Sequence, residues 1–160
     1  YTTLFRSDRV KATLFEGGLH VPLVVTGPQV AGPAESDALV SLVDLLPTVV
    51  DIAGGELPGG LDGVSLLPWL ADPAAPGPAY VHAAWDASRD VEGFDRAIRG
   101  DRFKLVQAAA GPASLYDLGA DPGEQVDLLA AGPLAPDAEA AYAELSARVE
   151  AEADRGLGAR

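Results

Sequence analysis

The sequence predicts an α/β fold followed by a small antiparallel sheet that a C-terminal helix packs against. An apolar run at residues 21–25 precedes a helical apolar pattern at 44–53, and a strand followed by a helix is the repeating unit of an α/β sheet. Beyond a proline-rich stretch, short strand-like segments follow one another without intervening helices. We therefore assign residues 1–72 to the end of a large α/β domain, 73–78 to a connection, and 79–160 to a small α+β subdomain.

The first element is the apolar run at 21–25, which ends at Gly27-Pro28. A run that is apolar on both faces is typical of a strand buried on both sides, as in a parallel sheet covered by helices. The next element is a helix for which we expect Asp44 to be the N-cap and Gly54 to mark the end. Pro47 then lies in the first turn, where its missing N–H has no intrahelical partner to lose.

The C-terminal part predicts a sheet and a helix. Residues 79–85, 96–98, 103–107 and 114–118 have the pattern of short strands, and Gly100-Asp101 fits a tight hairpin turn. The segment Asp121-Pro-Gly-Glu124 has proline and glycine where a type II turn requires them. Residues 137–155 predict a helix with Glu144 four residues before Arg148.

Composition excludes several classes of function. The net charge of −13 argues against nucleic acid, whose phosphates require a basic surface. No apolar run reaches the roughly 18 residues of a membrane helix, so we expect a soluble chain without a membrane partner. The absence of cysteine excludes disulfides and a cysteine nucleophile within these residues and leaves the compartment undetermined. The chain opens at Tyr1 and has no Met, which indicates either a processed start or a piece of a longer chain.

Five ordered segments between Lys11 and Leu128 resemble the type I, formylglycine-dependent sulfatases (arylsulfatases) of the alkaline-phosphatase-like superfamily. The first is Lys11 followed by Glu16-Gly-Gly18 and a Val-Pro strand, and the second runs from Ser36-Asp37 through Val43-Asp44 and Pro47-Thr48 to Asp51-Ile-Ala-Gly54. The other three are Asp62-Gly-Val-Ser-Leu-Leu-Pro68, the stretch 96–105, and the stretch 115–124. The resemblance implies that the chain is the C-terminal portion of an alkaline-phosphatase-like α/β sandwich with its small subdomain.

The resemblance also implies what this chain lacks. The family's nucleophile is a formylglycine made from Cys or Ser in a Cys/Ser-x-Pro-x-Arg motif, and its Ca²⁺ is held by Asp and Asn oxygens. Ser65-Leu-Leu-Pro68 has the wrong spacing and no arginine, and the calcium ligands would precede Tyr1. We therefore expect part of a sulfuric ester hydrolase that is inactive in isolation, and whether this chain by itself is an enzyme is left open.

Two residues are candidates for substrate contact. Lys11 matches the family's catalytic lysine, and the resemblance implies that its ammonium binds a sulfate oxygen. His20 is a weaker candidate for substrate binding, with a hydrogen-bonded structural role as the alternative. We expect Glu16 to anchor the turn behind Lys11 through backbone or arginine contacts, and no metal ligand is assigned.

Two other functions are kept open. One is a phosphonate or phosphate monoester hydrolase of the same superfamily, and the other is a non-catalytic, standalone domain. In a full-length sulfatase the partner is a small sulfate ester or a sulfated saccharide, and family members are often secreted or periplasmic. A strand at 21–25 then requires neighbours that this chain does not supply, so we expect oligomerisation or rearrangement to cover that edge.

Overall fold

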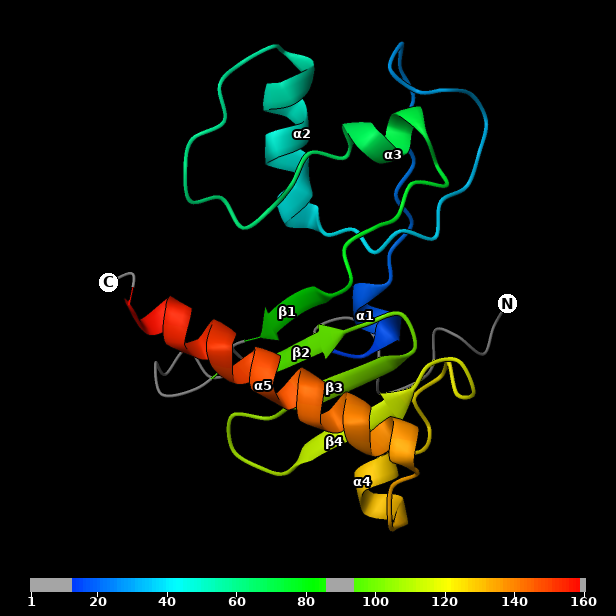
Figure 1. The fold of residues 1–160 in the computed structure, drawn as a ribbon, viewed down its shortest axis with the longest axis vertical. Helices are drawn as coiled ribbons and strands as arrows, with labels where there is room; N and C mark the ends of the chain where they lie inside the picture. The colour runs from blue at the N-terminus through cyan, green and yellow to red at the C-terminus, as the bar shows by residue number, and fades with distance from the viewer. Residues whose placement is uncertain (1–12, 86–93, 159–160) are drawn as a thin grey trace. The chain divides into compact units, whose positions relative to one another are not determined.

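The computed structural model describes residues 13–85 and 94–158, with side chains described up to residue 152. The chain divides into two compact units, one formed by Tyr1–Val21 with His82–Arg160 and the other by Pro22–Val81 (Figure 1). Residues 13–21 therefore belong to the same unit as the C-terminal sheet, although they lie well before its first strand in the sequence.

The C-terminal unit contains a four-stranded sheet in the order β1-β2-β3-β4. Its strands are β1 (Val81–Trp85), β2 (Asp95–Arg99), β3 (Phe103–Gln107) and β4 (Ala113–Asp117). The pairs β2–β3 and β3–β4 are antiparallel, which confirms the predicted small antiparallel sheet.

Helix α5 (Pro136–Gly158) packs on β2 and β3, and Figure 1 shows it running across the sheet. The register aligns Ile98, Leu105 and Leu115 in one row, and each is almost fully buried. Leu145 and Val149 of α5 are also buried, so this row and α5 form the core. No helix in the described part of the chain is long and apolar enough to cross a membrane.

Both predicted turns form, but the loop residues of the first and the type of the second differ from the prediction. Gly100 N donates to Phe103 O at 2.9 Å, so Asp101 and Arg102 occupy the hairpin loop, one position later than expected. Glu124 N donates to Asp121 O at 3.1 Å, which closes the second turn. The type II assignment was wrong, because the positive φ of 54° belongs to Glu124 and not to Gly123.

In the Pro22–Val81 unit, a 3-10 turn (Leu42–Asp44) leads into α2 (Leu45–Ile52), and α3 (Leu67–Ala71) follows. Gly54, with a φ of 69°, lies just after the end of α2, as predicted. Asp44 is the N-cap by position, but its carboxylate accepts from Ser41 N at 2.7 Å and Val64 N at 2.8 Å. The side chain therefore joins the helix start to the 62–66 loop and makes no bond to a helical N–H, contrary to expectation.

The predicted strand at residues 21–25 is wrong for this chain. The segment has no strand hydrogen bonding, and Val24 is 84% exposed. A buried strand requires partners on both edges and cover on both faces, and none of the described residues supplies them.

Candidate functional site

Lys11 lies outside the described residues, which begin at Thr13. The segment that follows forms the short helix α1 (Glu16–Leu19). Gly18 N and Leu19 N donate to Phe15 O at 2.8 and 3.0 Å, and His20 N donates to Glu16 O at 2.8 Å. The Glu-Gly-Gly sequence thus forms a single tight turn, as the two glycines indicated.

This segment packs on the sheet face opposite α5. Side chains alternate along a strand, so Lys104 and Tyr116, which are paired in register, lie on the other face from Leu105 and Leu115. The Phe15 ring meets the Tyr116 ring edge-on, with centroids 5.8 Å apart, and Leu14 is only 5% exposed. The chain just downstream of Lys11 is therefore anchored on the C-terminal sheet.

Four charged side chains gather at this contact, and we call them the Lys104 cluster: Glu16, Arg99, Lys104 and Glu124. Lys104 is fully buried, and its Nζ lies 2.9 Å from Glu16 Oε1 and 2.9 Å from Glu124 Oε1. Arg99 Nη1 lies 3.5 Å from Glu16 Oε2. With two cations and two carboxylates the cluster is neutral, which is the condition for holding charges away from water.

Glu124 is the member of the cluster whose carboxylate also contacts the backbone of Glu16. It is 2% exposed, and its Oε2 accepts from Glu16 N at 2.6 Å. Its other oxygen, Oε1, contacts Lys104 as an ion pair without hydrogen-bond geometry. Arg99 Nε is buried and makes no hydrogen bond to the described residues, so the arginine is held by its Nη1 contact with Glu16.

The arginine contact expected of Glu16 is confirmed, because its carboxylate contacts Arg99. The backbone contact is made by the N–H of Glu16, which donates to Glu124, and not by its carboxylate. Lys104 and Glu124 were missed as its partners. One signal for Lys104 was available, since it is the charged residue inside the apolar strand Phe103-Lys-Leu-Val106. Nothing local in the sequence links it to Glu16, which is 88 positions away.

His20 is placed at the surface. Its side chain is 72% exposed, and Nδ1 lies 3.6 Å from Glu16 Oε2. It is thus tethered to the Lys104 cluster by an exposed contact, and its role in substrate binding stays a prediction.

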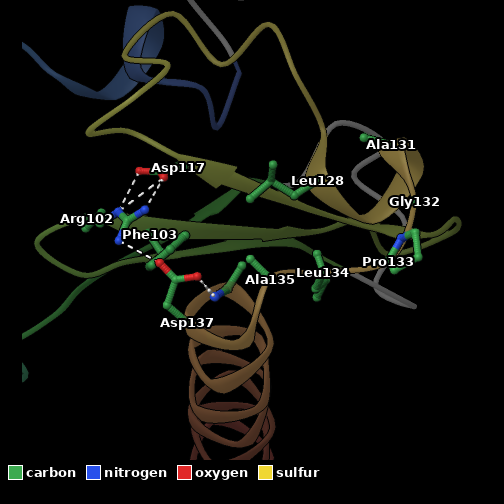
Figure 2. Close-up of a pocket in the computed structure, with 11 residues that line it drawn as sticks. Arg102, Phe103, Asp117, Leu128, Ala131, Gly132, Pro133, Leu134, Ala135 and Asp137 are labelled. Carbon is green, nitrogen blue, oxygen red and sulfur yellow. Dashed lines mark hydrogen bonds and ion pairs between the residues drawn. The ribbon is translucent and has the colours of Figure 1, made fainter.

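A second candidate is a shallow cavity of about 190 Å³ beside Arg102. Figure 2 shows Arg102 between the carboxylates of Asp117 and Asp137, with Nη2–Oδ2 at 2.6 Å to Asp117 and Nη1–Oδ2 at 2.8 Å to Asp137. The guanidinium carbon also lies 4.6 Å from the centroid of the Phe103 ring. We call Arg102, Asp117 and Asp137 the Arg102 cluster.

The ionisation of the Arg102 cluster indicates a structural role. The hydrogen bond from Arg102 holds the pKa of Asp117 below its ordinary value, and the bond to Asp117 raises the pKa of Arg102. Two carboxylates more than balance one cation, so no free positive charge is left to bind a sulfate. Among residues 13–85 and 94–152, no group of three or more Asp, Glu or His side chains is placed to hold a metal ion.

Comparison with known families decides what this fold belongs to. The model of the family described as N-sulphoglucosamine sulphohydrolase, C-terminal, matches residues 9–153. The chain belongs to this family. The resemblance to the C-terminal part of a sulfatase is therefore confirmed, and so is the predicted fold class.

Each relative matches this chain over only part of the relative's own length. Arylsulfatase K of Gallus gallus is 36% identical over 124 residues, which are 71% of this chain and 23% of that protein. A protein solved in complex with its substrate D-glucosamine-2-N,6-O-disulfate is 25% identical with a TM-score of 0.61, covering 78% of this chain and 26% of its own. The phosphonate monoester hydrolase of Silicibacter pomeroyi is 27% identical with a TM-score of 0.60, covering 74% and 26%. The chain thus spans about a quarter of the proteins it matches.

Proposed function

We propose that this chain is the C-terminal part of a sulfuric ester hydrolase, to which it contributes a sulfate-binding lysine, Lys11, and the small subdomain. The observation that carries the proposal is the family match over residues 9–153, which includes Lys11. The packing of the 13–19 segment on the C-terminal sheet supports it, because a lysine that binds substrate requires a fixed backbone.

The chemistry proposed for Lys11 is electrostatic. When a sulfate ester is cleaved, negative charge builds up on the leaving oxygen and stays on the sulfate oxygens. An ammonium is a compact charge with three donors and stabilises such oxygens best where water is excluded. The calcium ion that the family relationship implies would supply further positive charge at the sulfate. The described residues offer no set of ligands for it, so we assign no calcium ligand to this chain.

The substrate class we propose is a sulfated saccharide. The family's name refers to sulphoglucosamine, and one solved relative was captured with a glucosamine disulfate. In the described part of the chain, exposed His20 is the one candidate for recognising the sugar.

The Pro22–Val81 unit supports a role as part of a larger domain. Its exposed apolar side chains include Leu42 at 68%, Leu46 at 56% and Val49 at 63%, on or just before α2. Exposed apolar surface of this kind marks an interface in a soluble protein. We propose that residues 1–72 complete a large α/β domain in the longer protein, and that the isolated chain self-associates through this surface.

The test compares the isolated chain with a longer protein that contains it. With Ca²⁺ and an aryl sulfate, the isolated chain is expected to show no turnover. In the longer protein, Lys11→Ala should remove roughly 2–4 kcal/mol of transition-state stabilisation and lower kcat/KM by the corresponding factor. Arg9→Ala is the matched control, since it removes a neighbouring positive charge and should leave kcat/KM unchanged. Full activity of Lys11→Ala in the longer protein would refute the proposed role.

The similarity to a phosphonate monoester hydrolase keeps one alternative open. The discriminating measurement is the ratio of kcat/KM for an aryl sulfate to that for the matching aryl phosphonate monoester. A ratio above one supports the sulfatase, and a ratio well below one supports the alternative. If the chain is instead a standalone, non-catalytic domain, we expect it to be monomeric and not to bind a hydrophobic dye.

A further inference from the structure

The Lys104 cluster takes no direct part in the chemistry proposed above, yet it joins three segments that are distant in sequence. Glu16 comes from α1, Lys104 from β3, and Glu124 from the turn after β4. The sequence separations are 88 residues between Glu16 and Lys104 and 108 between Glu16 and Glu124. Contacts over such distances are formed only by the folded chain, and they meet at one residue, Glu16.

Glu16 is held by both its backbone and its side chain. Its N–H donates to Glu124 Oε2 at 2.6 Å, and its carboxylate is 2.9 Å from Lys104 Nζ. A residue restrained at both positions has little freedom to shift or rotate. Because Glu16 is the first residue of α1, the restraint fixes the start of that helix and the direction of the chain that enters it.

The backbone of Glu124 indicates that its carboxylate is required there. Its φ of 54° lies in the left-handed region, which is penalised for a residue with a side chain because the Cβ crowds the following carbonyl oxygen. Glycine takes this conformation without that penalty, and the neighbouring Gly123 does not use it. The turn alone would therefore favour glycine at position 124, whereas the contacts with Glu16 N and Lys104 Nζ require a carboxylate.

We propose that Lys104 and Glu124 are positioning residues that set the place of the sulfate-binding lysine. They fix the backbone at Glu16, which is five positions after Lys11 in the sequence, and they contact no substrate themselves. This inference rests on the proposed function of Lys11. It adds that the C-terminal subdomain contributes to catalysis by holding a segment from the other end of the chain.

The first experiment needs no activity. Amide hydrogen exchange in the present chain is measured for wild type, Glu124→Gln and Glu124→Gly. Glu124→Gln keeps an acceptor for Glu16 N, while Glu124→Gly keeps the backbone conformation and removes the acceptor. We expect exchange at Glu16 to be about tenfold faster or more in Glu124→Gly, with a smaller change in Glu124→Gln, while β3 amides remain protected.

Arg102→Met is the matched control for exchange, because it removes a cation of the hairpin loop between β2 and β3 that contacts Asp117 and Asp137 and not Glu16. It should leave exchange at Glu16 unchanged. Equal acceleration at Glu16 and at β3 amides in Glu124→Gly would mean that the residue serves global stability alone, and would overturn the inference.

The second experiment uses the longer protein and a double-mutant cycle with Lys11→Ala. Glu124→Gly and Lys104→Met should each lower kcat/KM by about 10–100-fold, mostly in kcat, because a misplaced group loses transition-state contact. Glu124→Gln should lower it less, because it keeps the acceptor for Glu16 N. In the Lys11→Ala background the same substitutions should have little further effect. Glu124→Gly serves where Lys104→Met fails to fold, since it removes the acceptor for Glu16 N and keeps the backbone conformation.

The outcomes separate the two proposals. If Lys11→Ala leaves activity intact, the proposed function fails, and the exchange experiment still reports on the anchoring of Glu16. If Lys11→Ala lowers kcat/KM as proposed but the effect of Glu124→Gly is undiminished in its background, Glu124 does not act through Lys11 and the inference fails.

Discussion

The C-terminal sheet carries one ionic cluster that is buried and one that is exposed, and the two illustrate different uses of charge. In the Lys104 cluster the cation is fully buried and shared by two carboxylates of distant segments. In the Arg102 cluster the side chain of Arg102 is 52% exposed and is likewise shared by two carboxylates. Lys104 and Arg102 each have two carboxylate partners, so the two clusters differ in burial and not in the number of ion pairs. A buried charge that loses its partner cannot be compensated by water, whereas an exposed one can.

The largest expected effect is that of Lys104→Met. It leaves Glu16 and Glu124 without their buried cation, and breaking a buried pair from one side typically destabilises by about 3–5 kcal/mol. Urea unfolding followed by circular dichroism at pH 7 measures it. A loss below about 1 kcal/mol would show that the cluster behaves like a surface pair, and the comparison would fail.

A smaller effect is expected when charge balance is restored. The double variant Lys104→Met/Glu124→Gln removes one cation and one carboxylate, so the cluster stays neutral with Arg99 and Glu16. Its destabilisation should fall short of the sum of the single variants by about 0.5–3 kcal/mol, as for residues in contact. Simple additivity in the same unfolding assay would argue that the two side chains are not energetically coupled.

We expect added salt to weaken the stabilising contribution of the Arg102 cluster and to leave that of the Lys104 cluster nearly unchanged. Raising ionic strength from about 0.01 to 1 M shortens the screening length from about 30 to 3 Å, which weakens exposed pairs first. The destabilisation by Arg102→Met should therefore shrink with added salt, while that of Lys104→Met stays nearly constant. The comparison is sharpened by running both variants in the same salt series, and equal salt dependence would contradict it.

The smallest effect concerns acid stability. Because the folded-state pKa of Asp117 is lowered by its hydrogen bond with Arg102, its stabilising contribution is complete above the unfolded-state pKa of about 3.9. That contribution is lost as the pH falls through the lower folded-state pKa. Arg102→Met should raise the Asp117 pKa, which an NMR titration of its carboxyl carbon measures. Asp127, which caps α4 (Leu128–Ala131) and has no contact with Arg102, provides the control resonance.

Several elements could be predicted from the sequence because short-range chemistry sets them. Strand 103–107 has the predicted bounds, and Gly54 lies after α2 where a residue with positive φ is needed. The Glu144–Arg148 pair forms at 3.2 Å, since positions four apart on a helix are neighbours. The sulfatase family could also be identified, because its motifs occur in order along the chain.

The tertiary structure decided the features that depend on distant partners. Residues 21–25 have the composition of a buried strand but remain without one, because strand formation requires neighbours rather than residue type alone. Asp44 has the position of a helix cap, yet its carboxylate is taken by Val64 N, 20 residues away. The positive φ of Glu124 could not be inferred from Pro122-Gly123, since the contact that requires it lies on Glu16.

The sequence by itself determined the family, the small antiparallel sheet of the C-terminal part and the identity of Lys11 as the candidate sulfate ligand. It could not identify Lys104 and Glu124, because a lysine in a strand and a glutamate in a turn are ordinary until the fold brings them to Glu16. Only the folded chain excludes water from these charges, and that exclusion strengthens the pairing that anchors the segment following Lys11 in the sequence.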